Sequence, residues 1–128
     1  MSIKQIVSTT AAPSAIGPYS QGVNVNGFLF VSGQLPIDPV TGSLVASDIA
    51  VQTRQSLSNL KAVVEASNLR MSDIVKVTVY LANMEDFSSM NDVYKDFFIV
   101  DYPARVAIQA ARLPKNALVE IDAIAIKQ

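Results

Sequence analysis

The sequence predicts an α+β protein in which a single mixed β-sheet carries two helices on one face. Three observations lead to this fold class. Six short segments alternate polar with apolar residues or are rich in β-branched residues, and two longer segments repeat their apolar residues at helical spacing. The segments follow one another in the order βββαβαββ. Because each helix lies between strands and crossovers are right-handed, both helices are expected on the same face.

The first half of the chain begins with three predicted strands. Residues 3–7 form a short strand, and residues 9–21, rich in Ala, Pro, Ser and Gly, form an ordered loop. Residues 22–33 read as a hairpin, because the dipeptide Asn26-Gly27 supplies the positive φ angles of a type I′ turn. A loop rich in Pro and Gly then leads to the first helix.

The first helix is expected from Asp48, a candidate N-cap, to about residue 67. Its apolar residues recur at helical spacing, with charged residues between them. Residues 74–82 then form a strand in which Lys76, Thr78 and Tyr80 face away from the apolar side. The apolar side of that strand consists of Val75, Val77, Val79 and Leu81.

A second helix is expected to begin near Met84, and two strands, 104–111 and 118–126, follow Pro103. The stripe of this helix is Phe87, Met90, Tyr94, Phe97 and Phe98, which we interpret as core. With two helices on one face, the other face of the sheet still carries apolar side chains. Association with further copies of the chain is the simplest way to cover them.

Length and composition point to one domain covering residues 1–128. Half of the residues are hydrophobic and 16% are charged, against roughly 25% in typical soluble domains. Burial between subunits would explain this, although a richly packed monomer would give a similar count. The start, MSIKQIV, lacks the features of a secretion signal, and no apolar run reaches the roughly 18 residues of a membrane span. The expectation is a soluble cytoplasmic protein.

Charge and residue usage exclude several classes of function. The net charge is −1, and like charges are not clustered into a footprint for nucleic acid. The chain has no Cys and no His, which removes thiol nucleophiles, imidazole bases and the usual zinc sites. No metal site is therefore predicted.

Two charges stand in apolar strands near the end of the chain. Arg105 is followed by Val106, Ala107 and Ile108, and Glu120 has apolar neighbours on both sides. Taken alone, such charges are more often structural, at a sheet edge or a subunit interface, than catalytic. A hairpin of these two strands would place both charges on one face, about 13 Å apart. A register slip or another pairing would change this, so one chain or two could supply them.

Three motifs in sequence order resemble the reactive intermediate deaminase family, in particular its RidA branch. They are GPYSQ at 17–21, VSGQLPIDPVTG at 31–42, and the PAR…LP…VEI pattern at 103–121. The resemblance covers essentially the whole chain. It implies a chorismate-mutase-like fold, a homotrimer with clefts between subunits, and no metal or organic cofactor. It also implies hydrolysis of 2-imino acids, such as 2-iminobutanoate and 2-iminopropanoate, to 2-oxo acids and ammonia.

The resemblance also assigns roles to residues. Arg105 corresponds to the arginine that binds the substrate carboxylate, and Glu120 to the residue that positions the attacking water. The further cleft residues are Tyr19 and Ser32, and backbone contacts are made by Gly33 and Ala107. Many relatives have Cys where this chain has Ala107. That difference puts thiol-based regulation in doubt but leaves the backbone N–H in place.

The chemistry is compatible with these residue types. The Arg105 guanidinium matches a carboxylate bidentately, and Glu120 can take a proton from water and return one to the leaving nitrogen. Asp122 shares a face with Glu120 and could raise its pKa or could simply point to solvent. Two other functions stay open: a non-catalytic trimer that binds small carboxylates, and an RNA-directed translation inhibitor or endoribonuclease, which the net charge disfavours.

Overall fold

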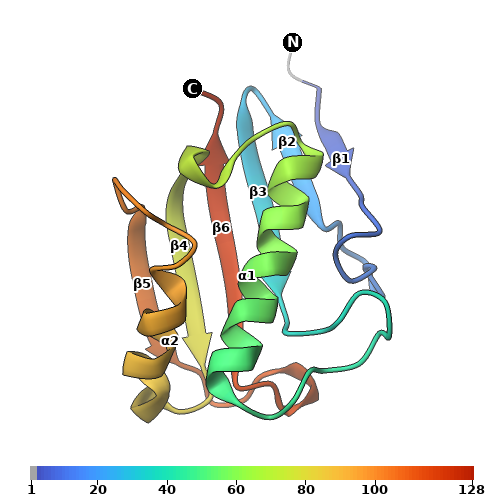
Figure 1. The fold of residues 1–128 in the computed structure, drawn as a ribbon. Coiled ribbons are helices and arrows are strands. Elements are labelled where there is room, and N and C mark those ends of the chain that lie inside the picture. Colours follow the sequence, from blue (N-terminus) through green and yellow to red (C-terminus); the bar gives the residue numbers. More distant parts are fainter. Residues whose placement is uncertain (1–2) are drawn as a thin grey trace.

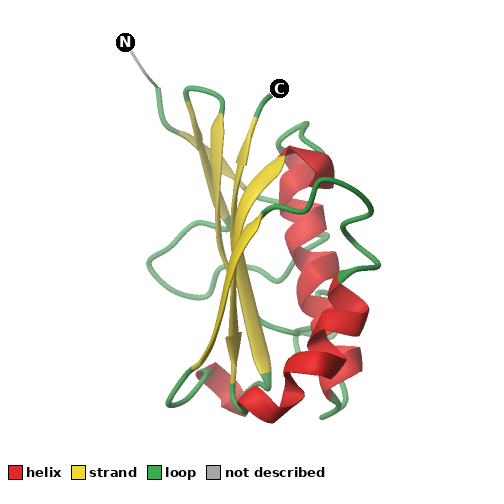
Figure 2. Ribbon diagram, turned by 90° about the vertical axis from the view of Figure 1, so that its left-hand side faces the viewer, coloured by secondary structure: helices red, strands yellow, loops and turns green. Residues whose placement is uncertain are grey.

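A computed structural model describes residues 3–128, and over that range the chain forms a six-stranded mixed sheet with two α-helices on one face (Figures 1 and 2). This confirms the predicted fold class and the order βββαβαββ. The elements are β1 Gln5–Val7, β2 Gly22–Val25, β3 Phe28–Gln34, α1 Ile49–Ala66, β4 Ile74–Leu81, α2 Phe87–Tyr94, β5 Ala104–Gln109 and β6 Val119–Ile126.

The strand order across the sheet is β1-β2-β3-β6-β4-β5. The pair β4–β5 is parallel, and the other neighbouring pairs are antiparallel. The last strand in sequence, β6, therefore lies at the centre of the sheet, between β3 and β4 (Figure 1). The edge strand β5 has no partner on its outer side within the described chain.

Local signals predicted two of the structural features well. Asn26 and Gly27 have φ angles of 53° and 80°, as the type I′ turn between β2 and β3 requires. Asp48 is the N-cap of α1, and its carboxylate accepts a hydrogen bond of 2.9 Å from the Val51 N–H. The buried stripe of α1, which includes Leu57, Leu60, Val63 and Val64, packs on the sheet.

The second helix is shorter than its apolar stripe predicted. A 3₁₀ turn at Met84–Asp86 precedes α2, and α2 itself ends at Tyr94. Phe97 and Phe98 lie beyond it, and the Phe98 ring still reaches the core, 4.6 Å from the ring of Tyr94. The spacing of apolar residues alone does not distinguish a helix that continues to Phe98 from a turn that places the Phe98 ring in the core.

The two faces of the sheet differ in burial. The face under the helices is buried, whereas on the opposite face, here called the open face, Phe28, Phe30, Val106 and Ile108 are 40–44% exposed. The expected apolar open face is therefore present. Val75 departs from the predicted pattern, because a register shift between Ile74 and Lys76 leaves it 42% exposed. In the described part of the chain, no helix combines the length and apolarity needed to cross a membrane.

The last two strands do not form a hairpin, and the alternative of another strand pairing holds. β5 and β6 both pair with β4, which lies between them. The crossover through α2 sends β5 to the outer edge beside β4, and the loop around Pro114 then carries the chain across β4 to the position of β6 (Figure 1).

Candidate functional site

A cavity of about 580 Å³ contains four of the six predicted site residues: Tyr19, Ser32, Gly33 and Glu120. Its walls come from the loop between β1 and β2, the end of β3, the loop before α1, and the turn Pro114–Asn116. Glu120 reaches it from the open face, because the neighbouring β6 residues Val119 and Ile121 are buried on the other face.

The loop that carries Tyr19 is held by a buried glutamine to which the sequence analysis assigned no role. The Gln21 Oε1 accepts a 2.7 Å hydrogen bond from the Thr9 N–H. Its Nε2 lies within hydrogen-bonding distance of three carbonyl oxygens, those of Thr9 at 3.0 Å, Ala12 at 3.3 Å and Pro13 at 2.8 Å. The sequence feature that could have pointed to this role is the position of Gln21 at the end of the GPYSQ motif. This 4% exposed side chain therefore joins residues on both arms of the loop.

Ser32 and Tyr19 play different parts in this wall. The Ser32 hydroxyl donates to the Ser20 carbonyl at 2.5 Å, and the Ser32 N–H donates to the Gln21 carbonyl at 2.9 Å. Ser32 thus ties the loop to β3. Tyr19 is 51% exposed at the cavity, so its ring and hydroxyl are accessible to a ligand.

Gly33 lies directly beside the Glu120 carboxylate. A Cβ atom at position 33 would be 2.9 Å from the Glu120 Cδ and would overlap its Oε2. Only glycine leaves the carboxylate room against β3 in this position. A larger residue at position 33 would therefore displace the Glu120 carboxylate.

Glu120 is in an environment that favours its protonated form. Burial raises the pKa of this carboxyl above its ordinary value, and the negative charge of Asp122 raises it further. Asp122 lies two residues along the same face and accepts a 3.0 Å hydrogen bond from the Tyr80 hydroxyl. Of the two alternatives for Asp122, the structure therefore favours the one in which its charge raises the pKa of Glu120. Asp122 does not simply point to solvent, because it is hydrogen-bonded to Tyr80.

Arg105 lies on the other face of the sheet. It is opposite Val77 in the parallel β4–β5 register, and Val77 is buried beneath the helices. Its Nη1 donates to the Asn91 Oδ1 at 2.7 Å. The guanidinium carbon lies 4.7 Å from the centroid of the Tyr94 ring and 5.5 Å from that of Phe87. Two aromatic rings and one amide therefore orient the guanidinium.

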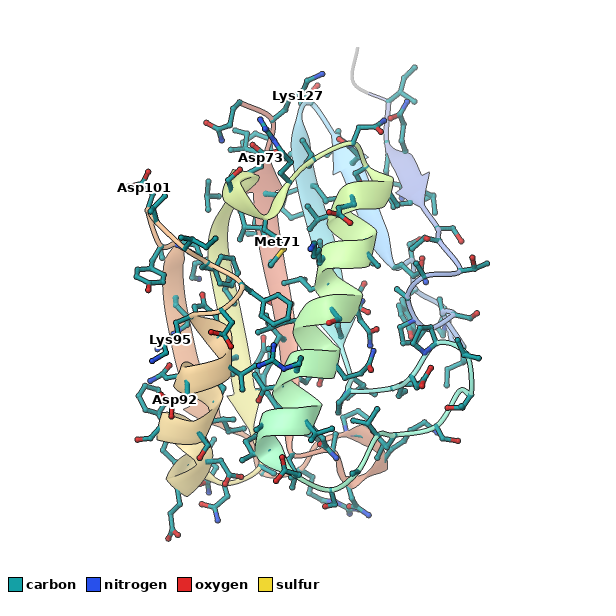
Figure 3. All side chains as sticks on the ribbon, in the orientation of Figure 1. Met71, Asp73, Asp92, Lys95, Asp101 and Lys127 are labelled. Atoms are coloured by element: carbon teal, nitrogen blue, oxygen red, sulfur yellow. The ribbon has the colours of Figure 1, made fainter. Side chains whose placement is uncertain are left out.

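A second cavity, of about 470 Å³, opens beside Arg105 and is lined also by Asn91, Tyr94, Lys95 and Tyr102. Lys95 directly follows α2, and its exposed ammonium lies 3.7 Å from the Asp92 carboxylate (Figure 3). Burial raises the pKa of Tyr94 to about 12, so this phenol stays neutral beside the guanidinium. Two cations, Arg105 and Lys95, therefore line this cavity, and the Arg105 guanidinium lies against its Tyr94 wall.

Ala107 follows Arg105 on the edge strand. The Ala110 N–H donates to the Leu81 carbonyl at 2.8 Å, which fixes which residues of β5 bond to β4. Because bonding alternates along a parallel strand, the N–H groups of Arg105 and Ala107 point away from β4, toward the free edge. Within the described chain, β5 therefore carries the Arg105 side chain on its helix face and outward backbone N–H groups along its free edge.

The two charged residues are thus separated within one chain. Arg105 lies on the helix face of β5, Glu120 lies on the open face of β6, and β4 runs between them. The expectation that they share a face, which depended on the hairpin, is wrong. The two side chains are on opposite faces because Arg105 pairs with Val77 of β4, whereas Glu120 pairs with Tyr80 of the same strand. Over residues 3–128, no group of three or more acidic side chains is placed to hold a metal ion.

Comparison with known proteins gives consistent matches over nearly the full length. The profile of the family described as Endoribonuclease L-PSP matches residues 9–127. A RutC family protein of Pyrococcus horikoshii is 52% identical over 98% of this chain and 100% of that protein. A 2-iminobutanoate/2-iminopropanoate deaminase of Salmonella typhimurium is 46% identical over 98% of this chain and 100% of its own length. The crystal structure of Escherichia coli TdcF with bound serine is 46% identical, with a TM-score of 0.93, over 97% of this chain and 99% of that one.

Proposed function

Because the chain belongs to the Endoribonuclease L-PSP family, which includes the RidA proteins, we propose that it is a hydrolytic deaminase of small 2-imino acids. Its substrates are compounds such as 2-iminobutanoate and 2-iminopropanoate, and its products are 2-oxo acids and ammonia. The observation that carries this proposal is Glu120, a half-buried carboxyl with a raised pKa at the wall of a cavity.

Glu120 supplies the proton transfers that the reaction needs. Water adds to the carbon of the C=N bond, and Glu120 takes a proton from the water as the new C–O bond forms. It then returns a proton to nitrogen as the tetrahedral intermediate collapses and the C–N bond breaks. One water is consumed and one ammonia leaves, so no oxidant, reductant or covalent nucleophile is required.

Arg105 binds the substrate carboxylate, and in this proposal it comes from a second copy of the chain. Arg105 and Glu120 of one chain are on opposite faces of the sheet, so they cannot hold one small molecule between them. A neighbouring copy can bring its β5 edge, with Arg105 and the outward N–H of Ala107, against the cavity. The guanidinium fork and the edge amide then match the anionic end of the substrate.

A homotrimer is the assembly that we propose for this arrangement. The open face carries partly exposed Phe28, Phe30, Val106 and Ile108, an apolar surface of the kind that subunit association buries. An edge that docks into another copy's cavity is a head-to-tail contact, which closes into a ring when the rotation permits. Each ring of three would contain three equivalent sites.

The test is a coupled assay in which an amino-acid dehydratase generates the imine in the presence of the purified protein. The wild-type chain should accelerate formation of the 2-oxo acid, and Arg105→Ala and Glu120→Gln should each lower kcat/KM at least about 100-fold. Lys95→Ala is the control, because Lys95 lines the same cavity as Arg105 but is an exposed cation just after α2. Wild-type rates in Arg105→Ala would contradict the proposal.

A binding protein without turnover is the second candidate, favoured by the related TdcF structure that holds serine, a small molecule with a carboxylate. Calorimetry with 2-oxobutanoate and serine, run beside the imine assay, separates the two. Binding that depends on Arg105, with no acceleration of hydrolysis, would favour the binding protein. The net charge of −1 gives little support to the RNA-directed activity that the family's description suggests.

A further inference from the structure

A polar pair on the open face lies next to Glu120 and outside the catalytic roles described above. Tyr80 of β4 is opposite Glu120 in the antiparallel register, and Thr78 is opposite Asp122. The Tyr80 side chain leans diagonally, and its hydroxyl donates to the Asp122 Oδ2 at 3.0 Å. Both Tyr80 and Asp122 are partly buried. The hydrogen bond therefore fixes the Asp122 carboxylate on the face that carries Glu120.

The spacing along β6 places the two carboxyl groups within electrostatic reach. Residues two apart on one face of a strand are about 7 Å apart, so the charge of Asp122 acts on Glu120 through a partly desolvated region. The Tyr80 bond keeps the Asp122 side chain from swinging away into water, where its charge would be screened. The pair thus delivers a negative charge to a defined place beside Glu120.

We propose that Asp122, held by the Tyr80 hydroxyl, is a positioning residue that acts through Glu120 and governs when Glu120 takes up and releases its proton. This inference rests on the proposed function for its catalytic meaning. A proton-transfer group works best when its pKa lies near the pH at which the enzyme acts. Burial and the charge of Asp122 both raise the pKa of Glu120 from the acidic range toward neutral pH. Burial raises the pKa of Tyr80, and its hydrogen bond to Asp122 raises that pKa further, so the hydroxyl stays a donor.

Other side chains also line the Glu120 cavity or lie on the open face. Tyr19 and Lys115 line the same cavity, and Lys76 of β4 lies on the open face farther along the strand. From β3, the facing groups are Ser32 and Gly33, which carry no charge. Positive charges close to a carboxyl favour its ionised form, and in the proposed assembly Arg105 of a neighbouring copy would add such a charge. Asp122 opposes these cations, so its removal should have a measurable effect.

The first experiment is the pH dependence of kcat/KM for imine hydrolysis. Asp122→Asn removes a negative charge, so the pKa of Glu120 falls, and the acid limb of the profile should move to lower pH by about 0.5–1 unit. Tyr80→Phe should move it in the same direction by less, because Asp122 stays charged but is no longer fixed. Asp122→Glu, which keeps the charge, should restore most of the wild-type limb. Glu65→Gln, an exposed charge on α1, is the control and should leave the limb unchanged.

The second experiment does not depend on catalysis. Glu120 is one of three glutamates in the chain, so carbon-13 labelling of glutamate gives carboxyl signals that can be titrated one by one, with Glu120→Gln identifying the signal. A lower titration midpoint for Glu120 in Asp122→Asn supports the inference even if the protein hydrolyses no imine. Identical midpoints in wild type, Asp122→Asn and Tyr80→Phe would overturn it, as would an equal shift in Glu65→Gln.

Discussion

A side chain at position 33 would compete for space with the Glu120 carboxylate, which lies directly beside Gly33. A methyl group there would overlap the Glu120 Oε2, and that oxygen is the end of a flexible side chain rather than backbone. The carboxylate is therefore expected to move aside while β3 keeps its path. If Glu120 makes the proton transfers that we propose, Gly33 acts on them through the position of the carboxylate.

We expect Gly33→Ala to lower kcat about 10- to 100-fold, because displacement of a catalytic group by about 1 Å costs that much. The free energy of unfolding of Gly33→Ala should change by only about 1 kcal/mol, because the Glu120 carboxylate can move away from the added methyl group. Steady-state kinetics and urea denaturation measure the two effects. Gly17→Ala is the matched control, because a Cβ at position 17 would be in ordinary contact with the Tyr19 ring, at 3.6 Å. A folded Gly33→Ala with wild-type kcat would contradict this role.

At the scale of elements, the loop between β1 and β2 is the part of the cavity wall that depends most on one side chain. Gln21 accepts from one backbone N–H and faces three carbonyls of that loop. Gln21→Ala leaves these groups without their partner, and we expect a loss of about 1–3 kcal/mol in the free energy of unfolding. Denaturation in urea measures it.

The loop should also become accessible before the rest of the chain unfolds. Limited proteolysis of Gln21→Ala should cut first within residues 9–21, whereas Gln5→Ala, an exposed glutamine on β1, should behave as wild type. Equal protection of the loop in both variants would show that Gln21 does not hold it.

Sequence reasoning succeeded where the signal was local. The Asn26-Gly27 turn, the Asp48 cap and the helical spacing of α1 each lie within a few residues of the feature that they specify. The strand that pairs with β5 could not be predicted in this way, because it depends on where the connection through α2 places β5 in the sheet. Arg105 and Glu120 were identified from the resemblance and their apolar neighbours, but their separation on opposite faces followed from strand pairing. The role of Gln21, and the identity of Arg105 as the hydrogen-bond partner of Asn91, followed only from contacts across the fold.

At the scale of the whole molecule, the division of the site leads to a prediction about mixtures of inactive variants. Arg105→Ala keeps an intact Glu120 cavity, and Glu120→Gln keeps an intact Arg105 edge. If each site joins the edge of one copy to the cavity of the next, a mixed trimer contains some sites with both residues present. If one chain supplied both, every site in the mixture would lack one of them.

Mixing the two variants after denaturation, in equal amounts, should therefore restore activity on refolding. Random assembly pairs an intact edge with an intact cavity in about one quarter of the sites, so the expected rate is about a quarter of that of refolded wild type. Sizing before and after mixing should give three times the 13.7 kDa of one chain. The double variant carrying both substitutions, mixed with Arg105→Ala, is the control and should stay inactive, because no chain in that mixture supplies the arginine. A mixture of single variants that assembles but remains inactive would place the arginine and the glutamate of one site in the same chain.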